Sequence, residues 1–308
     1  MRSRPEYPER MAKSDVVQAF GPASLSDLKV RTTFCDAPTR SRAGLNTLRV
    51  MTFNVRQPDA SDGPNGWRQR RDLLVDTILE NDPDVIGTQE LFRVQAEYIT
   101  KRAPQYAWFG SGRFGTHEDN HVGIFYKRDR IRLLAHGDFW LSETPETPGS
   151  SSWDIIRPRQ LTWGALEADG VGCFHVLNTH FPYRAVEQEA RRKTALLIKA
   201  RMGRMPRLAP AILMADFNSP AGGDVYQLLC DDLRDAWCTA AARTGPEGTL
   251  HGFGTRVPDR RIDWILYRGF WRVLAAETIT RSRDGRYPSD HFPVLVTFDV
   301  SDVSEVRA

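Results

Sequence analysis

Short apolar runs that end in polar residues recur along the chain from Leu48 onward. LRVMTFNV (48–55) starts with alternating apolar and polar positions and continues as an apolar run, the pattern of a strand that becomes buried. Other segments have the length and apolar character of buried strands, namely 84–90, 121–127, 159–168, 173–181, 210–218, 263–270 and 292–300. Strands therefore dominate the predicted secondary structure.

Two segments have the apolar spacing of amphipathic helices. The first is expected over residues 67–80, with an apolar face of Leu73, Leu74, Ile78 and Leu79, and Asp82-Pro83 ends it. The second is expected over 185–202, with a stripe of Val186, Ala190, Leu197 and Ile198. Residues 141–154 have no periodicity and predict a long loop, a kind of loop that is often functional. Helices between some of the strands favour a layered α/β sandwich with mixed sheets.

The N-terminal region differs in character from the rest of the 308-residue chain. Residues 1–46 are polar, contain scattered Pro and Arg, and have no sustained periodicity, so we expect an extension that is partly disordered or draped over the domain. The main domain is expected over 47–303. The net charge of +3, from 42 basic and 39 acidic residues, lies in the first 47 residues, which leaves the domain formally neutral and without a strongly basic footprint of nucleic-acid binding.

The composition also bears on location. No apolar run is long enough to span a membrane, and the first residues, MRSRPEYPER, contain no apolar core of a secretory signal. The four cysteines (Cys35, Cys173, Cys230 and Cys238) form no CxxC pair and have no zinc-site spacing, which favours free thiols in a reducing compartment. We therefore expect a cytoplasmic protein with no membrane association and no obligate protein partner.

Carboxylates, amides and imidazoles follow or flank most of the predicted strands. They are Asn54, Gln89, Glu90, Asn178, His180, Asp216, Asn218, Asp263, Asp290 and His291. Strand ends that converge at one rim commonly form a site, although each of these residues by itself is more often a cap, a turn residue or a structural hydrogen-bonding group. As a set they supply mostly oxygen ligands, which suit Mg²⁺ or Mn²⁺ better than zinc. In-line displacement at phosphorus needs an activated water, charge neutralisation and help for the leaving oxygen, and these groups can provide all three.

The order of six motifs resembles the endonuclease/exonuclease/phosphatase superfamily, which has the DNase I-like fold. The motifs are TFNV, PDVIGTQE, NTH, ADFN, IDWIL and SDHFPV, and they extend over roughly residues 48–300. The ordered set is specific, whereas any single motif is not. The resemblance implies a four-layer α/β sandwich of two packed mixed β-sheets flanked by helices, and it makes 47–303 a catalytic domain that depends on Mg²⁺ or Mn²⁺.

The resemblance also implies a role for each motif residue. Glu90 corresponds to the main metal ligand, with Asn54 and Asp290 close to the metal or its waters. Asp216 corresponds to the group that positions and deprotonates the attacking water. Asn218 corresponds to a donor to a phosphate oxygen, and Asp263 to a carboxylate that orients a histidine. His291 corresponds to a histidine that contacts the phosphate and helps to transfer a proton. His180 corresponds to a second histidine, which stabilises the transition state or protonates the leaving group.

Two features depart from the common pattern. Ala215 replaces the usual glycine before Asp216, and this is tolerated if its φ angle is negative. The NTH motif continues as FPYR, and together with the 141–154 segment this is similar to an uncharacterised bacterial branch of the superfamily. We expect Arg159, His121, Tyr183 and Arg184 to bind substrate. The structural alternatives are a surface ion pair for Arg159, an exposed histidine at the start of a strand for His121, and ordinary surface residues for Tyr183 and Arg184.

The predicted function is a divalent-metal-dependent phosphoester hydrolase acting on a phosphorylated small molecule or on nucleic acid. The neutral domain favours a small soluble phosphomonoester. The alternative is a DNase I-like or deadenylase-like nuclease, because Arg68, Arg70 and Arg71 and Arg191, Arg192 and Lys193 could form backbone-binding patches, although exposed helix charges are the ordinary explanation. A lipid phosphodiesterase lacks an evident membrane-binding helix. A non-catalytic binding module would have lost site residues, and none is lost.

Overall fold

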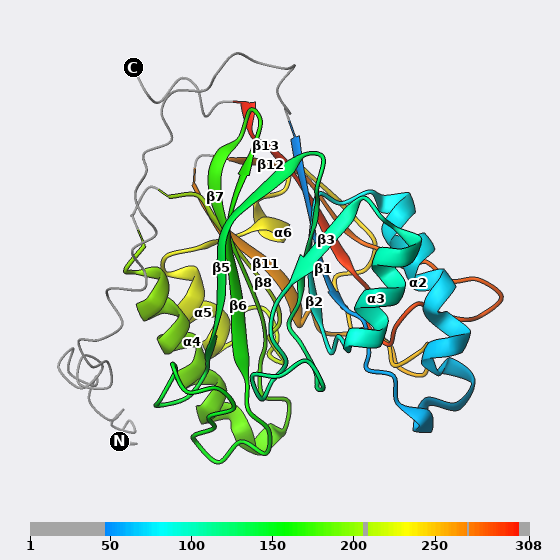
Figure 1. The fold of residues 1–308 in the computed structure, drawn as a ribbon, viewed down its shortest axis with the longest axis horizontal. Coiled ribbons are helices and arrows are strands. Elements are labelled where there is room, and N and C mark those ends of the chain that lie inside the picture. The colour runs from blue at the N-terminus through cyan, green and yellow to red at the C-terminus, as the bar shows by residue number, and fades with distance from the viewer. Residues whose placement is uncertain (1–46, 206–208, 270, 302–308) are drawn as a thin grey trace, which may run out of the picture. The chain divides into compact units, whose positions relative to one another are not determined.

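Two β-sheets pack face to face, and helices cover their outer faces (Figure 1). The computed structural model describes residues 47–205, 209–269 and 271–301, and the predicted extension over 1–46 lies outside these residues. In order, the layers are a helical layer containing α2 and α3, a seven-stranded sheet, a six-stranded sheet, and a helical layer containing α4 and α5 (Figure 1). This four-layer α/β sandwich confirms the predicted fold class.

The seven-stranded sheet has β1 and β2 near its centre, and these two strands run parallel. Its strands in spatial order are β10 (Ala242–Thr244), β12 (Arg272–Thr278), β13 (Val294–Asp299), β1 (Thr47–Asn54), β2 (Val85–Gln89), β4 (Ile124–Lys127) and β3 (Tyr106–Phe109). Because β1 and β2 are parallel, their carboxyl ends lie at the same edge of the sheet.

The six-stranded sheet also has a parallel pair at its centre, β7 and β8, and β11 lies antiparallel beside β8. Its strands in spatial order are β5 (Ile131–Trp140), β6 (Gln160–Ala168), β7 (Gly172–His180), β8 (Ala211–Asp216), β11 (Asp263–Arg268) and β9 (Arg234–Asp235). The end of β7, the end of β8 and the start of β11 therefore meet at one edge.

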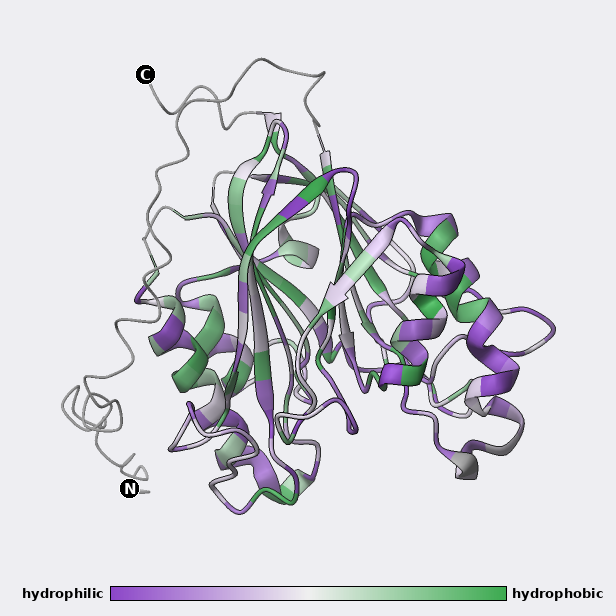
Figure 2. Cartoon of the chain, in the orientation of Figure 1, coloured by the Kyte–Doolittle hydropathy of each residue, from purple (hydrophilic) through white to green (hydrophobic). Residues whose placement is uncertain are grey.

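Five α-helices and two 3₁₀ turns are described between the strands. The α-helices are α2 (Trp67–Asn81), α3 (Arg93–Arg102), α4 (Gln188–Met202), α5 (Asp224–Cys230) and α6 (Ala236–Thr239), and the 3₁₀ turns are η2 (Ala60–Asn65) and η3 (Ala185–Glu187). Hydrophobic and hydrophilic residues are interspersed along the outer helices, as expected when one face of a helix rests on a sheet (Figure 2). The described part of the chain contains no helix that is both long and apolar enough to cross a membrane.

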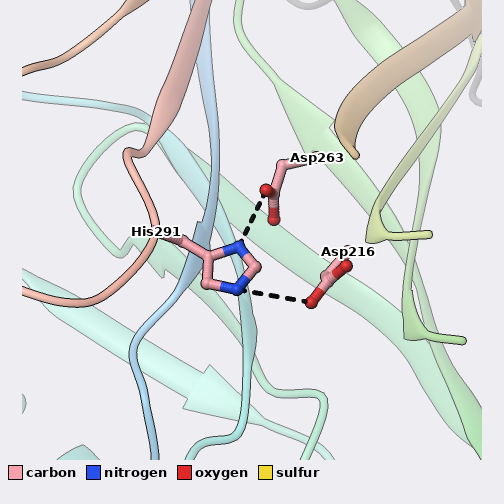
Figure 3. A group of neighbouring side chains, drawn as sticks. All are labelled: Asp216, Asp263 and His291. Carbon is pink, nitrogen blue, oxygen red and sulfur yellow. Dashed lines mark hydrogen bonds and ion pairs between the residues drawn. The ribbon is translucent and has the colours of Figure 1, made fainter. Parts of the chain in front are cut away.

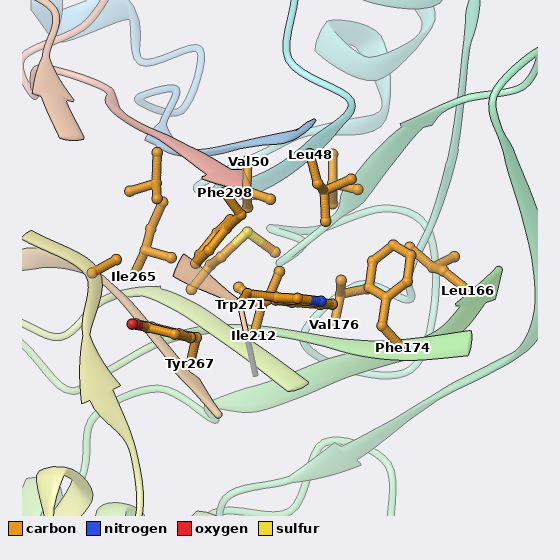
Figure 4. Close-up of a cluster of buried hydrophobic side chains, with 14 of the residues drawn as sticks. Leu48, Val50, Leu166, Phe174, Val176, Ile212, Ile265, Tyr267, Trp271 and Phe298 are labelled. Atoms are coloured by element: carbon orange, nitrogen blue, oxygen red, sulfur yellow. The ribbon is translucent and has the colours of Figure 1, made fainter. Parts of the chain in front are cut away.

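The alternation of side chains along β1 divides the apolar residues between two core clusters. Leu48 and Val50 belong to the cluster between the sheets, where they join residues of the other sheet such as Phe174 and Ile212 (Figure 4). Phe53 lies in the second cluster, which also contains residues of α2 and α3. Each fully buried side chain of this kind contributes roughly 1.5–3 kcal/mol. The two sheets are therefore held firmly against each other, and so are the strand ends that they carry.

Several elements differ from the sequence-based expectation. The apolar pattern did not predict α3, because its buried positions are Gln95, Ala96 and Ile99 and its Val94 is exposed. It also did not predict β5, an edge strand in which most of the residues before Phe139 are exposed or half-buried. The strand expected over 121–127 begins only at Ile124, and the strand expected over 263–270 begins at Asp263 but ends at Arg268. The expected loop over 141–154 contains no helix or strand.

Candidate active site

Strand register brings the polar strand-end residues together. Asn54 lies opposite Gln89 across the parallel pair β1 and β2, so that Glu90 follows directly at the same edge. In the other sheet His180 and Asp216 are register partners, and Asp263 lies opposite Asp216 from the antiparallel strand β11. Residues that are widely separated in the sequence therefore become neighbours through pairing alone.

Hydrogen bonds between side chains connect the two sheets at this rim. Asn54 Nδ2 donates to Asp216 Oδ2 at 3.0 Å and lies 3.4 Å from Glu90 Oε1. His291, which precedes β13, forms a 2.9 Å hydrogen bond between its Nδ1 and Asp263 Oδ2. A single small region therefore combines a glutamate and an asparagine from one sheet with aspartates from the other.

His291 lies between two aspartates, Asp263 and Asp216 (Figure 3). Its Nδ1 bonds to Asp263, and its Nε2 lies 3.9 Å from Asp216 Oδ2. Burial would lower the pKa of His291, but the charges of Asp263 and Asp216 outweigh it and raise the pKa well above the usual value. His291 is therefore a cation at neutral pH, held in a fixed orientation by Asp263.

His180 has the opposite protonation tendency. Its Nε2 lies 3.3 Å from Asp216 Oδ2, while its Nδ1 is buried and has no hydrogen-bond partner among the described residues. Burial, together with the nearby charge of Arg159, lowers the pKa of His180. Two histidines that share one aspartate are thereby driven to different charge states, a pattern found where acid and base roles are divided.

Asp216 is the centre of this network. Burial would raise the pKa of Asp216, but His180 and His291 outweigh it, and with the backbone amide of Asn218 they lower the pKa. That amide donates to Asp216 Oδ1 at 2.9 Å, and the Asn218 side chain donates to the carbonyl of Phe181 at 3.1 Å. Asp216 is consequently an oriented carboxylate. Ala215 precedes it in β8 and is not among the residues with positive φ, so that its methyl group is accommodated.

Glu90 and Asp290 form a more open side of the site. The side chains of both are 18% exposed, whereas those of Asp216 and Asp263 are 2% and 1% exposed. Burial and the charge of Glu90 raise the pKa of Asp290, although His291 and Arg56 oppose this. Two neighbouring carboxylates that repel each other in this way are suited to holding a cation.

Two groups of side chains in this site could hold the expected metal ion. Asp216, Asp263 and His291 offer ligand atoms that all lie within 4.8 Å of one another. However, His291 Nδ1 is already bonded to Asp263, and all three side chains are nearly closed to water. Mg²⁺ usually retains several waters and binds through one or two carboxylates. The more open pair of Glu90 and Asp290 therefore fits a hydrated Mg²⁺ or Mn²⁺ better, with the buried Asn54 beside Glu90.

The predicted substrate residues occupy different environments. Arg159 precedes β6, is 5% exposed and lines a small cavity together with His180. Tyr183 is exposed, and the centroid of its ring lies 6.0 Å from the Arg159 guanidinium. Arg184 bonds to Glu187 at 3.1 Å. His121 is fully buried, and its ring nitrogens face the Leu91 carbonyl and His117. The structure therefore brings Arg159 and Tyr183 together, whereas His121 supports the chain segment next to Glu90.

Arg56 belongs to the site and was missed by the sequence analysis. Its guanidinium bonds to Asp62 at 2.8 Å, and it lies 3.8 Å from Glu90 and 4.0 Å from Asp290. Its position two residues after Asn54 was the available signal. Arg56, Glu90 and Asn218 also share positive φ angles of 50°, 59° and 47°. Such strained backbone is common at functional sites, where the surroundings enforce it.

One arginine of each basic helix cluster is buried, contrary to the ordinary expectation for helix charges, while Arg68 is exposed and Arg71, Arg192 and Lys193 are half-buried. Arg70 is 1% exposed and donates to the carbonyls of Val55 and Pro288 at 2.6 and 3.0 Å. Arg191 is 8% exposed and donates to the carbonyls of Pro182 and Arg184. Each arginine anchors loops beside the site, because a guanidinium can satisfy several carbonyls at once.

Comparison with known proteins agrees with this geometry. A model of the endonuclease/exonuclease/phosphatase family matches residues 51–291. A mannosyl-6-phosphatase of Bacteroides thetaiotaomicron VPI-5482 is 32% identical, with a TM-score of 0.75 over 82% of this chain and 99% of that chain. A family protein of unstated activity from Bacteroides thetaiotaomicron is also 32% identical, with a TM-score of 0.77 over 82% and 97%.

A more distant sequence relative is Nocturnin of Drosophila melanogaster. It is 23% identical over 88% of this chain. The match covers 49% of Nocturnin, so the chain spans about half the length of that curated relative.

Proposed function

The chain belongs to the endonuclease/exonuclease/phosphatase family, and from this premise we propose that it is a divalent-metal-dependent hydrolase of a small soluble phosphomonoester. The observation that carries the proposal is the buried carboxylate of Asp216, whose Oδ2 lies 3.3 Å from His180 Nε2 and 3.9 Å from His291 Nε2 and accepts a hydrogen bond from Asn54 at 3.0 Å. The similarity to a mannosyl-6-phosphatase over most of both chains supports a phosphomonoester over a polymer. Burial of Arg70 and Arg191 supports the same choice, because it removes residues from the basic patches that a nuclease would need.

In the proposed mechanism Asp216 orients the attacking water and accepts its proton. Its lowered pKa suits a group that must be ionised before substrate arrives. His291, as a cation fixed by Asp263, donates its Nε2–H to a phosphoryl oxygen and takes part in returning a proton to the leaving oxygen. Asn218, next to Asp216, provides a further donor to the phosphate. His180 holds the second side of Asp216 and faces the leaving group.

Glu90, Asp290 and Asn54 are the residues that would hold the metal. When bound there, Mg²⁺ or Mn²⁺ would neutralise charge on the phosphoryl oxygens. Arg56 balances these carboxylates and keeps Glu90 in place. A cytoplasmic location remains a prediction; Cys230 and Cys238 are free thiols, in agreement with the expectation for these cysteines.

Substrate assays with an Asp216 variant test this function. With Mg²⁺ or Mn²⁺, purified protein is expected to release phosphate from sugar or nucleotide monophosphates without cutting plasmid DNA or poly(A), and EDTA is expected to stop the reaction. Asp216→Asn is expected to lower kcat at least a hundredfold while circular dichroism stays unchanged, because general-base catalysis typically contributes 10²–10⁴-fold. Asp129→Asn, at an exposed position, is the matched control.

Three results would count against the proposal. Cleavage of a polymer without phosphate release from monoesters would favour the nuclease alternative. Full activity in EDTA would remove the metal from the mechanism. An Asp216→Asn variant within about tenfold of the wild type would show that another group activates the water, since tenfold corresponds to only about 1.4 kcal/mol of the barrier.

A further inference from the structure

A cavity with room for about one water molecule lies beside His180. Its free volume is about 10 Å³, close to the roughly 10–15 Å³ that one bound water needs. A phosphate group or a sugar ring therefore does not fit in it. The residues that line the cavity are all buried, and Val122, Arg159, Gln160 and His180 are among them. We refer to it as the His180 cavity.

Three buried side-chain atoms of these lining residues have no hydrogen-bond partner within the described part of the chain. They are Nδ1 of His180, Oε1 of Gln160 and Nη1 of Arg159. A buried polar atom without a partner is unfavourable, and ordered water often supplies the missing bond. Three such atoms on residues around one small cavity point to a common partner inside it.

The bond between His180 and Asp216 determines which nitrogen of His180 carries the proton. His180 Nε2 lies 3.3 Å from Asp216 Oδ2, and an ionised carboxylate can only accept, so the proton is on Nε2. Burial and the charge of Arg159 lower the pKa of His180, which keeps the ring neutral. His180 Nδ1 is therefore a free acceptor.

The other two atoms have equally defined roles. The side-chain nitrogen of Gln160 donates to the Ser111 carbonyl, so Gln160 Oε1 is a second free acceptor. Gln160 cannot serve His180 directly, because both free atoms are acceptors. Arg159 Nη1 can only donate. Two acceptors and one donor match a single water molecule, which donates two hydrogen bonds and accepts at least one.

Strand pairing keeps Gln160 beside His180. Leu161 of β6 pairs with Thr179 of β7, so Gln160 and His180 are the next positions of the two strands. The Thr179 hydroxyl also donates to the Gln160 carbonyl at 2.7 Å. The position of Gln160 relative to His180 is therefore fixed by the sheet.

We propose that one water molecule binds in the His180 cavity, donates to His180 Nδ1 and Gln160 Oε1, and accepts from Arg159 Nη1. Gln160 is then a positioning residue that acts on His180 through this water. It holds the ring with Nε2–H directed at Asp216 and the leaving group. This inference rests on the proposed function, which places His180 at the leaving group.

A crystal structure of the full chain tests the water site. At a resolution that shows ordered waters, one water is expected at hydrogen-bond distance, about 2.7–3.2 Å, from all three atoms. The same water is expected to be lost in Gln160→Met, which keeps the length of the side chain and removes the acceptor. A wild-type cavity without an ordered water, or with a water that does not contact His180 Nδ1, would overturn the proposal.

Nuclear magnetic resonance of ¹⁵N-labelled histidine tests the effect on His180 itself, with His180→Gln to assign the signals. The wild type is expected to have His180 in the Nε2–H form, with the signal of a hydrogen-bonded Nδ1. In Gln160→Met this signal is expected to move toward that of a nitrogen without a hydrogen bond. Gln188→Met, the same change at an exposed position, is the control. An unmoved Nδ1 signal in Gln160→Met would show that Gln160 is merely structural.

Kinetics test the positioning role, with whichever phosphomonoester the wild type hydrolyses. Gln160→Met is expected to lower kcat about tenfold or more with little change in KM, because a misplaced catalytic group weakens the transition state and leaves binding intact. Val122→Ile adds a methyl group to the cavity lining without altering Gln160, and is expected to exclude the water and lower kcat as well. A variant that lacks the water but keeps the kcat of the wild type contradicts the proposal.

The crystal structure and the resonance measurement need no substrate, so they separate this inference from the proposed function. If the water and the Nδ1 shift are found but no monoester is hydrolysed, the water site stands and the proposed function fails. If monoesters are hydrolysed but the water or the shift is missing, the proposed function stands and the role of Gln160 is refuted.

Discussion

Histidines in this protein differ in charge because their immediate surroundings differ. His180 and His291 are both buried and both face Asp216, yet only His291 has a second aspartate at hydrogen-bond distance. The charge of Asp263 outweighs the cost of burial at His291, while the charge of Arg159 adds to that cost at His180. At the scale of the residue, the reactivity of an imidazole is therefore set by its nearest charged neighbours.

His251 is another buried histidine, and it leads to a prediction about pH. It stacks on Phe292 at 3.9 Å and accepts a hydrogen bond from Gly254, and burial lowers its pKa to about 4. The unfolded chain, with a histidine pKa near 6.5, binds more protons than the folded chain between these two values. We expect the free energy of unfolding to fall as the pH falls through this window.

Denaturant unfolding at about pH 7 and about pH 5 measures this contribution. His251→Asn keeps an acceptor for Gly254 but cannot take up the proton, so its stability is expected to fall less over the same window. His136→Asn, at an exposed histidine, is the control. A fall in His251→Asn as steep as in the wild type would show that His251 does not contribute.

At the scale of the element, α2 positions the site through one side chain. Arg70 donates to the carbonyls of Val55 and Arg56, after β1, and to that of Pro288, just before Asp290. It therefore connects the segment that carries Asn54 with the segment that carries Asp290 and His291. Lysine could not replace it fully, because a point charge does not reach three separate carbonyls in fixed directions.

Replacing Arg70 is expected to damage both stability and activity. Arg70→Met leaves several buried carbonyls without donors, and each such group costs about 1–3 kcal/mol, so we expect a loss of about 3 kcal/mol or more in the free energy of unfolding. Urea unfolding and kcat together provide the measurement. Arg68→Met, two residues earlier on the exposed face of α2, should change neither quantity appreciably. Unchanged stability in Arg70→Met would show that water replaces the lost donors.

At the scale of the whole molecule, the site lies where the two sheets meet. Glu90 and Asn54 come from the seven-stranded sheet, and Asp216 and Asp263 from the six-stranded sheet. The bonds from Asn54 to Asp216 and from His291 to Asp263 cross between them. A cation bound here would be bound by the folded state alone, and such binding stabilises a protein by mass action.

Thermal unfolding with and without metal distinguishes the two possible cation sites. Mg²⁺ or Mn²⁺ is expected to raise the Tm of the wild type, EDTA to reverse this, and Glu90→Gln to abolish the increase. Asp263→Asn is expected to retain most of it. The reverse outcome, with the increase lost in Asp263→Asn and kept in Glu90→Gln, would place the metal among Asp216, Asp263 and His291.

The sequence by itself determined the fold class, the edges of the strongest elements and the residue types of the site. Apolar runs such as LRVMTF and AILMA have the length and composition of buried strands, and the order of the polar groups after them indicated one family. It could not predict α3, whose buried Gln95 is held by hydrogen bonds to the Phe92 amide and the Arg56 carbonyl rather than by an apolar pattern.

The tertiary structure alone decided the charge states and the partners. Whether an arginine forms a surface patch, as expected for Arg70, or a buried clamp depends on carbonyls brought together from distant segments. The same holds for Arg113 and Arg159, because 46 positions separate them in the sequence and only the fold places both around one cavity. Periodicity records which side chains are buried, but electrostatic energy depends on distances and desolvation that only the folded arrangement fixes.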